Sequence, residues 1–322
     1  MNHSHDGPQD LSREPSGAPV AGVASPEETR EGLLRGQVRG YTQIRNLLVQ
    51  LPEADADGSR SSVLARAVTE RRRRELLLYL LLLGARPVVE SQQEREPLAA
   101  AVWIRALTGP GEPPWSTTTL SRAWSNLEQM GLLDTKREKR AKWVAPFRED
   151  GTGVPYEKPG GRNGRENHYF ILPDSFWHSG LFAQLTLPGL AMFLLLLKET
   201  NKEPEFQISA ERVEDWYGIS RRSAQNGIDD LEANAILLKR PEREREPLSA
   251  SGYTTRIYYS LTGEYSQTSR RALQEEATRI VTKRAADTAA RALAGEPAGT
   301  AEKSHKRPRK RLRKAGERLE TT

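Results

Sequence analysis

The chain of 322 residues contains no cysteine, which excludes disulfide bridges and thiolate metal sites. A chain that forms no disulfide suits a reducing compartment. No apolar run approaches the roughly 18 residues that a membrane-spanning helix requires, and the longest are Leu76–Leu83 and Met192–Leu197. The N-terminal residues are polar and lack the apolar stretch of a secretory signal. We therefore expect a cytoplasmic location and no contact with a membrane.

The chain also lacks the sequence signatures of common enzyme sites. It has no Gly-x4-Gly-Lys-Ser/Thr phosphate loop. His3 and His5 are similar to the paired metal-binding histidines of rolling-circle nucleases, but their neighbours are polar rather than the apolar residues of a strand. His168 and His178 are ten residues apart, which does not match the spacing of zinc ligands. We predict no catalytic residue, no metal site and no cofactor.

The formal net charge of +6 is concentrated near the C-terminus. The segment Lys303–Lys314 carries eight basic residues and no acidic one, so the other 310 residues sum to −2. Such a block cannot form a core, and we predict that it is disordered when free and binds DNA phosphates without regard to sequence. The residues predicted to do so are Lys306, Arg307, Arg309, Lys310, Arg311, Arg313 and Lys314. A solubilising tail or a nuclear-import signal would have the same composition.

A twenty-residue pattern occurs twice without a gap, at Ser116–Thr135 and Ser220–Lys239. Each copy opens with a serine that can cap a helix, followed by apolar residues at positions i, i+4 and i+7. These apolar residues are Leu120, Trp124 and Leu127 in the first copy and Ala224, Ile228 and Leu231 in the second. A small residue, Gly131 or Ala235, then precedes two apolar residues. The pattern predicts an amphipathic helix that leads directly into a buried strand.

The other side of each predicted helix carries polar residues that can bind nucleic acid. Hydroxyl, amide and guanidinium groups form hydrogen bonds with base edges and with phosphates. These residues are Thr117, Thr118, Ser121, Arg122 and Ser125 in the first copy, and Arg221, Arg222, Gln225 and Asn226 in the second. Asp229 and Asp230 are also predicted to lie on an exposed helical face. Neither face is strongly basic.

The residues around the second copy complete a pattern of three helices and a hairpin. In order, the predicted elements are a helix at Leu187–Lys198, a helix at Ser209–Gly218, the repeated helix, and strands at Ile236–Lys239 and Thr254–Leu261. Gly218 provides the turn between the second and third helices, as in a helix-turn-helix unit. The charged loop Arg240–Gly252 joins the strands and carries Arg243 and Arg245, which we predict to contact DNA.

The first copy has the same order of elements with longer connections. Its predicted elements are a helix ending in Leu76–Leu83, a helix at Leu98–Leu107, the repeated helix, and strands at Trp143–Phe147 and His168–Leu172. The turn Thr108–Trp115 is rich in glycine and proline, so the docking angle of the repeated helix is left open. The predicted DNA contacts after that helix are Arg137 and Arg140 from the basic segment Lys136–Lys142, and Arg162 and Arg165 from a Gly-rich loop.

Over about residues 61–261, this order resembles tandem winged helix-turn-helix proteins, among them bacterial plasmid replication initiators and MarR-like proteins. The resemblance implies a mainly α fold with small β-wings (α+β). It also implies that the second helix of each helix-turn-helix enters the major groove of DNA, while the wings touch the backbone or the minor groove. We predict a first winged-helix domain at 61–180 with a long wing at 148–165, and a second at 181–263 with a wing at 240–252.

The segments outside these domains are predicted to be helical or disordered. Residues 1–24 are rich in Gly, Pro and Ser and form a predicted disordered arm. Residues 25–60 are predicted to be a weak helical segment and linker, with a helix start at Ser25 and an apolar side, interrupted by three glycines, that reaches Leu48. Residues 264–294 are predicted as a C-terminal helix and 295–322 as the basic disordered tail. Either helix is a candidate for homodimer formation, and the C-terminal one also for packing on the second domain.

Two functions fit these observations. The first is sequence-specific binding of double-stranded DNA by the two repeated helices, in a nucleoid-associated replication initiator or transcriptional regulator. The second is a structural adaptor, in which the winged helices bind protein and the basic tail tethers the assembly to nucleic acid. Initiator and regulator differ in their partners and genomic position, which the sequence does not contain.

Overall fold

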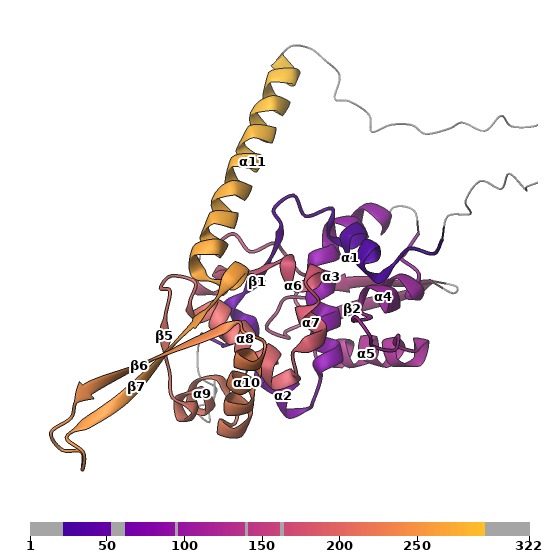
Figure 1. The fold of residues 1–322 in the computed structure, drawn as a ribbon. Coiled ribbons are helices and arrows are strands. Elements are labelled where there is room, and N and C mark those ends of the chain that lie inside the picture. The colour runs from indigo at the N-terminus through magenta and orange to yellow at the C-terminus, as the bar shows by residue number, and fades with distance from the viewer. Residues whose placement is uncertain (1–21, 53–61, 94–95, 139–140, 162–163, 294–322) are drawn as a thin grey trace, which may run out of the picture.

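The computed structural model describes residues 22–52, 62–93, 96–138, 141–161 and 164–293 (Figure 1). Helices and small antiparallel sheets alternate along these residues, in agreement with the predicted α+β class. None of the described helices is long and apolar enough to cross a membrane. The basic tail, most of the N-terminal arm with His3 and His5, and also Arg140 and Arg162 lie outside the described residues.

The first helix is tied to the rest of the fold by a buried arginine. Helix α1 (Pro26–Leu34) begins with a capping box, in which the Ser25 and Glu28 side chains each accept the other's backbone N–H. Arg30 is 1% exposed, and its guanidinium donates to the carbonyl oxygen of Ala106 at 3.1 Å. This bond satisfies a carbonyl at the end of a distant helix, so α1 is part of the core.

The chain after α1 forms a strand where the sequence predicted a helical apolar side. Gly40, with φ +69°, precedes β1 (Tyr41–Arg45), which is followed by the 3-10 turn η1 (Asn46–Leu48). All five β1 residues are buried, because the strand pairs with a second strand and is covered on both faces. The prediction of a weak helix continuing to Leu48 is therefore wrong beyond Leu34.

Four helices and a hairpin make up the first unit. They are α2 (Val63–Thr69), α3 (Arg73–Gln93), α4 (Ala100–Ala106), α5 (Thr117–Gln129), and the antiparallel strands β2 (Leu133–Glu138) and β3 (Ala141–Pro146). Helices α4 and α5 meet at Trp103 and Trp124, whose rings pack edge to face with centroids 5.4 Å apart. The helices predicted at Leu76–Leu83, Leu98–Leu107 and Ser116–Met130 are thus present, but α3 continues ten residues beyond the predicted end at Leu83, and α2 was not predicted.

The next strand does not belong to this hairpin. Strand β4 (Tyr169–Pro173) pairs antiparallel with β1 along its whole length. The prediction that the strands at Trp143–Phe147 and His168–Leu172 flank a wing at 148–165 is therefore wrong. The hairpin of the first unit is β2–β3, and its two strands are drawn from the segment around Lys136–Lys142.

The second unit repeats the order of helices and ends in a longer hairpin. Its elements are α6 (Ser175–His178), α7 (Leu181–Gln184), α8 (Leu187–Glu199), β5 (Phe206–Gln207), α9 (Ala210–Tyr217), α10 (Arg221–Ala233), β6 (Leu237–Arg245), β7 (Tyr253–Leu261) and the 3-10 turn η3 (Gly263–Tyr265). The sheet order is β5-β7-β6, and β6–β7 projects from the body as a two-stranded ribbon (Figure 1). β6 continues through Pro241, which an edge strand tolerates, so the wing loop is shorter than the predicted 240–252.

One continuous buried core joins the two units. It extends from Leu33 in α1 to Tyr265 in η3 and includes the apolar sides of α3, α5, α8 and α10. At the start of α3, the Arg73 guanidinium donates to the carbonyl oxygens of Phe182 and Leu185, both at 2.8 Å. The segment that leads into α8 is therefore fastened directly to the first unit.

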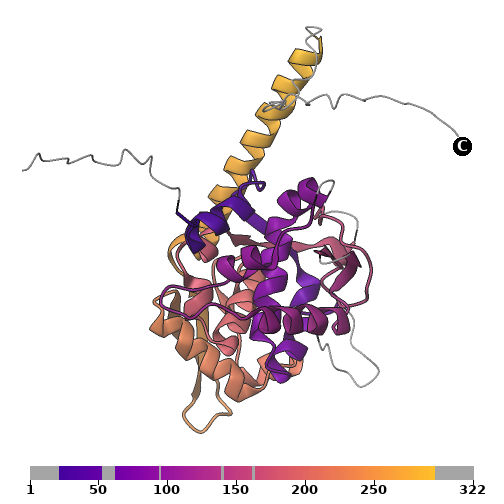
Figure 2. The same cartoon turned by 90° about the vertical axis from the view of Figure 1, so that its right-hand side faces the viewer.

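The predicted C-terminal helix is confirmed as α11 (Gln267–Leu293), which leaves the body of the protein (Figures 1 and 2). Its first turn is anchored by Arg270, which donates to the carbonyl oxygens of Leu197 at 2.8 Å and Thr200 at 2.7 Å. Burial lowers the pKa of Arg270 to about 10. Residues 281–290 are all exposed, so α11 packs on the body only through its N-terminal part, which contacts the second unit at Arg270 and the β1–β4 sheet at Leu273 and Ala277.

Candidate nucleic-acid interface

Helices α5 and α10 have the same length and the same N-terminal cap. Each contains 13 residues. The Ser116 hydroxyl accepts the N–H of Thr119 at 3.0 Å, and the Ser220 hydroxyl accepts the N–H of Ser223 at 3.3 Å. A serine cap satisfies one of the free amides of the first turn, so both copies of the sequence pattern begin a helix at the same point.

The two helices also end in the same way. The residues after the last turn are Gly131, with φ +70°, and Ala235, with φ +56°. Their N–H groups donate to the backbone carbonyl oxygens of Glu128 and Glu232, at 3.0 and 2.9 Å respectively. A left-handed residue at this place closes the helix and redirects the chain into β2 or β6. The sequence repeat is therefore a repeat of local structure.

All of the predicted base-contacting residues on the two helices are exposed, and the apolar residues between them are buried. The exposed residues are Thr117, Thr118, Ser121, Arg122 and Ser125 on α5, and Arg221, Arg222, Gln225 and Asn226 on α10. The buried residues are Leu120, Ala123, Trp124 and Leu127 on α5, and Ala224, Gly227, Ile228 and Leu231 on α10. The amphipathic assignment of both helices is thus confirmed, and contact of these residues with DNA remains a prediction.

The arginines of α10 differ in their partners. Arg221 forms ion pairs with Glu211 at 3.2 Å and Glu214 at 3.1 Å, both on α9. The Arg222 side chain is exposed and forms no hydrogen bond or ion pair with a described residue. Arg222 is therefore the cation on this helix that can meet an external anion without first giving up an internal partner. Arg122 on α5 is exposed in the same way.

A close approach between α8 and α10 fixes the orientation of α10. A Cβ atom at Gly227 would lie 2.4 Å from the carbonyl oxygen of Pro188, and one at Gly189 would lie 1.9 Å from the Asp230 carboxylate. That carboxylate accepts the backbone N–H and the hydroxyl of Thr186 at 2.8 and 2.7 Å. Asp230 is therefore a tertiary contact at the start of α8, and its assignment to an exposed face is wrong.

The ribbon β6–β7 carries its unbalanced positive charge on one face. Cross-strand pairing places Lys239, Arg243 and Arg245 on the same face as Tyr253, Thr255, Ile257 and Tyr259, with no acidic residue among them. We call this the cationic face. The opposite face has Arg240 and Arg256 together with Glu242 and Glu244, and these four residues form ion pairs.

The cationic face is the one turned toward α10. Lys239 contacts Glu232 of α10 at 2.5 Å, and Leu237 and Leu261 on the same face are buried in the core. Farther out, the Arg243 guanidinium lies over the Tyr253 ring at 4.7 Å. On the opposite face, bonds from Arg240 hold the pKa of Glu205 below its usual range. Arg243 and Arg245 therefore continue the exposed surface that begins on α10.

No family model, curated protein or solved structure matches this chain.

The exposed side of α5 faces a groove. A cavity of about 580 Å³ lies between α4, α5 and the β2–β3 hairpin. Its walls include Thr117, Ser121 and Ser125 from α5, and Thr135 and Lys142 from the hairpin. In this unit too, the polar helix face and the hairpin border one continuous surface. Lys136 is exposed on β2, whereas the side chain of Arg137 and the whole of Arg140 lie outside the described residues.

Arg165 lies away from this surface. It begins the 3-10 turn η2 (Arg165–Asn167) and lines a separate depression of about 230 Å³ with Asn46, Gln50 and His168. The prediction that Arg165 belongs to the wing beside α5 is therefore wrong. The reason is that the chain after β3 leads to β4, which pairs with β1 and adds no strand to the β2–β3 hairpin.

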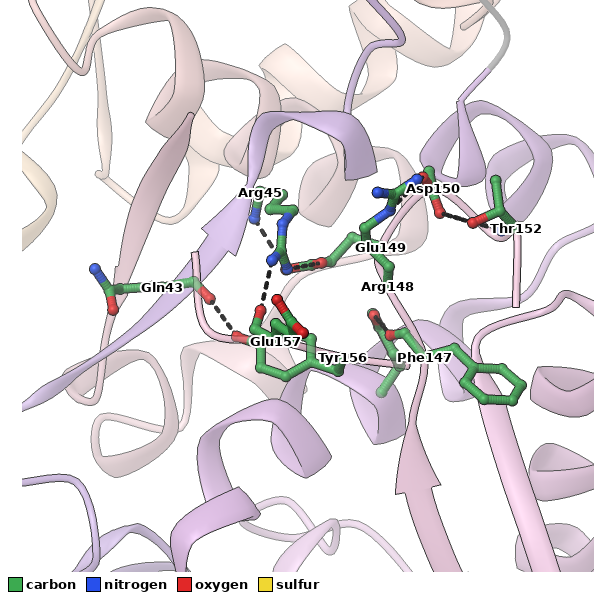
Figure 3. Close-up of polar contacts among 10 residues, drawn as sticks. Gln43, Arg45, Phe147, Arg148, Glu149, Asp150, Thr152, Tyr156 and Glu157 are labelled. Atoms are coloured by element: carbon green, nitrogen blue, oxygen red, sulfur yellow. Dashed lines mark hydrogen bonds and ion pairs between the residues drawn. The ribbon is translucent and has the colours of Figure 1, made fainter. Parts of the chain in front are cut away.

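A buried ion pair holds this crossing in place (Figure 3). The Arg45 guanidinium contacts the Glu149 carboxylate at 2.8 Å and donates to the carbonyl oxygen of Glu157 at 2.5 Å, while the backbone N–H of Arg45 donates to Glu149 at 3.0 Å. Burial raises the pKa of Glu149, and the Arg45 charge opposes this effect. Sequence reasoning missed the pair because arginine and glutamate are ordinarily surface residues.

Proposed function

We propose that the chain binds double-stranded DNA through two winged helix-turn-helix units, formed by α3–β3 and α8–β7. The observation that carries the proposal is the distribution of charge on the β6–β7 ribbon. The face turned toward α10 holds three cations and no acidic ribbon residue; Lys239 pairs with Glu232 of α10, and Arg243 and Arg245 form no ion pair with a described residue. On the other face, Arg240 and Arg256 are both neutralised by ion pairs. Solubility alone does not require the unpaired cations to lie on one face of the ribbon. A DNA duplex bound beside α10 would contact only the face turned toward α10, so DNA binding accounts for this asymmetry.

In the proposed complex, α10 occupies the major groove. An α-helix fits this groove, and guanidinium and amide groups form paired hydrogen bonds with guanine and adenine edges. Arg222 and Asn226 are exposed on α10, and the structure gives neither side chain a partner among the described residues. The cationic face of β6–β7 then contacts the adjacent backbone, which contributes affinity without reading sequence.

Helix α5 is proposed to read a second segment of the same DNA with fewer charges. Its exposed side has four hydroxyl residues and one arginine, Arg122. Serine and threonine hydroxyls can donate or accept hydrogen bonds and therefore distinguish poorly between bases. We expect α5 to orient the protein on the DNA more than to select a base sequence. We expect the second unit to dominate affinity. Whether the chain acts as a replication initiator or a transcriptional regulator depends on where its DNA site lies.

An adaptor function is the second proposal, and one observation favours it. Arg221 is neutralised by Glu211 and Glu214, and Trp216 on the adjacent α9 is 44% exposed. A charge-balanced surface with an exposed tryptophan is also suited to binding protein. In that case the helices bind a partner, and only the basic tail, which lies outside the described residues, contacts nucleic acid.

Selection of duplexes from a random-sequence library by the full chain separates these functions. Recovery of a defined motif that persists when Lys303–Lys314 is deleted supports DNA reading by the folded units. Arg222→Ala should weaken binding to that motif by about 1–3 kcal/mol, because the variant loses a hydrogen bond to a base edge. The base preference at the contacted position of the motif should be lost as well. Arg271→Ala on α11 is the matched control, since Arg271 is exposed but paired with Glu275.

Recovery of no motif, or binding that disappears with the tail, contradicts the DNA-reading proposal and favours the adaptor. When a motif is recovered, mapping of bound DNA across the genome separates the two biological roles. Sites at a replication origin indicate an initiator, and sites at promoters indicate a regulator.

A further inference from the structure

Four consecutive arginines, Arg71–Arg74, span the turn after α2 and the first two residues of α3, and two of them are used within the fold. Arg72 pairs with Glu70 at 3.1 Å and with Glu75 at 3.6 Å. Arg73 donates to carbonyl oxygens before α8. The side chains of Arg71 and Arg74 are exposed and form no hydrogen bond or ion pair with a described residue. Two cations of this run are thus available to an external anion.

The arginine run lies between the two candidate reading helices. Arg74 lies over the ring of Trp115 at 5.8 Å, and Trp115 directly precedes the cap of α5. On the other side, Arg73 bonds to Leu185, and the next residue, Thr186, is bonded to Asp230 of α10. Figure 1 shows α10, α2 and α5 along the same lower side of the molecule.

Arg71 occupies a backbone position that favours glycine. Its φ is +58°. The N–H groups of Arg71 and Arg72 donate to the carbonyl oxygens of Val68 and Ala67, respectively, and these bonds close the C-terminus of α2. A non-glycine residue in this conformation costs roughly 1 kcal/mol or more. The exposed side chain has no hydrogen bond or ion pair among the described residues that would offset this cost. Strained residues of this kind concentrate at sites of function.

We propose that Arg71 and Arg74 hold a backbone phosphate of one DNA duplex that spans α5 and α10. This inference rests on the proposed DNA binding and adds a third contacting element between the two helices. Guanidinium groups bind phosphate oxygens through paired hydrogen bonds. The acids next to the run in the sequence, Glu70 and Glu75, are both paired with Arg72. The charges of Glu112 and Asp230 act on Arg73, and neither acid forms an ion pair with Arg71 or Arg74 in the described part of the chain. A single chain then binds an asymmetric site, with two read segments separated by a segment contacted only at its phosphates.

The substitution Arg71→Gly separates a DNA contact from a structural role, because the two predict changes of opposite sign. Glycine relieves the backbone strain, so the variant should unfold no more easily than the natural chain. Its affinity for the selected duplex should fall about three- to tenfold, and the slope of log affinity against log salt should become shallower by about 0.9. Ala235→Gly is the backbone control, since it relieves a positive φ without removing charge. Arg271→Gln is the charge control.

Ethylation of individual phosphates locates the contact. Phosphates whose ethylation blocks binding of the natural chain should include one between the two read segments, and Arg71→Gly should become insensitive to ethylation at that position. Unchanged affinity, slope and ethylation pattern in Arg71→Gly overturn this inference while the proposed function stands. Failure of the full chain to select any motif overturns the proposed function, and this inference with it.

Discussion

Gly131 and Ala235 occupy the same position at the end of the two repeated helices, both with positive φ. Each donates its N–H to the residue three before it, and each precedes the first strand of a hairpin. The sequence repeat places the two residues 15 positions after the capping serines Ser116 and Ser220. Only the first copy has the residue that this conformation favours.

Exchanging glycine and alanine at these two positions should therefore change stability in opposite directions. Ala235→Gly should raise the free energy of unfolding by up to about 1 kcal/mol, because the left-handed strain is removed. Gly131→Ala should lower it by more than about 2 kcal/mol, since the new Cβ would lie 2.2 Å from the carbonyl oxygen of Gly151. Urea denaturation of the two variants measures both effects, and changes of the same sign contradict this account.

The close contact between α8 and α10 makes a second prediction. Gly227→Ala should destabilise the protein by about 1–3 kcal/mol, because the added methyl group meets the backbone of Pro188 and the side chain of Met192. Gly32→Ala in α1 is the control, since nothing lies within 4 Å of its Cβ, and it should stabilise by up to about 1 kcal/mol. If thermal unfolding gives the same change in stability for Gly227→Ala and Gly32→Ala, helix propensity and not the contact with α8 determines the effect of the Gly227 substitution.

Asp174 should make stability depend on pH. Burial raises its pKa from 3.8 to about 7, and one of its carboxylate oxygens has no hydrogen-bond partner. The folded state therefore binds the proton more tightly than the unfolded state. Its contribution to stability is present below pH 4 and declines as the pH rises toward 7.

The substitution Asp174→Asn removes this titration. At pH 8 the variant should exceed the natural chain in unfolding free energy, by on the order of a few kcal/mol, and at pH 4 the two should be close. Urea denaturation at both pH values gives the comparison. Parallel pH profiles for the two proteins would mean that Asp174 keeps its charge in the folded state.

The two faces of the β6–β7 ribbon provide an internal comparison for DNA binding. Replacing both Arg243 and Arg245 with alanine should weaken binding to any duplex and reduce the salt slope by up to about 1.8, or about 0.9 for each phosphate that is no longer neutralised. Replacing both Arg240 and Arg256 on the opposite face removes the same charge and should leave the slope unchanged. The salt slope is obtained from the DNA affinity of each double variant measured at several salt concentrations from low to moderate. An equal loss of affinity in both double variants would contradict the role of the cationic face.

Much of the fold within each unit follows from local sequence. The helices around Leu120 and Ile228, their serine caps and their buried sides were predicted from residues within a few turns of one another. Helix capping and the 3.6-residue period depend on near neighbours, so one short segment contains the information. The same reasoning identified the exposed polar residues of α5 and α10.

Strand pairing and the fate of individual charges were decided by tertiary structure. Arg45 and Glu149 form a buried pair across 104 residues, and this pair directs the chain away from the wing expected at 148–165. Arg30 and Arg270 are internal caps for carbonyl groups 76 and 73 residues away, whereas Arg222 remains exposed. These arginines are alike in the sequence. The sequence by itself determined which helices repeat and which sides they bury, and only the packing of distant segments decided which cations are available for a partner, because burial and pairing of a charge depend on residues far away in the chain.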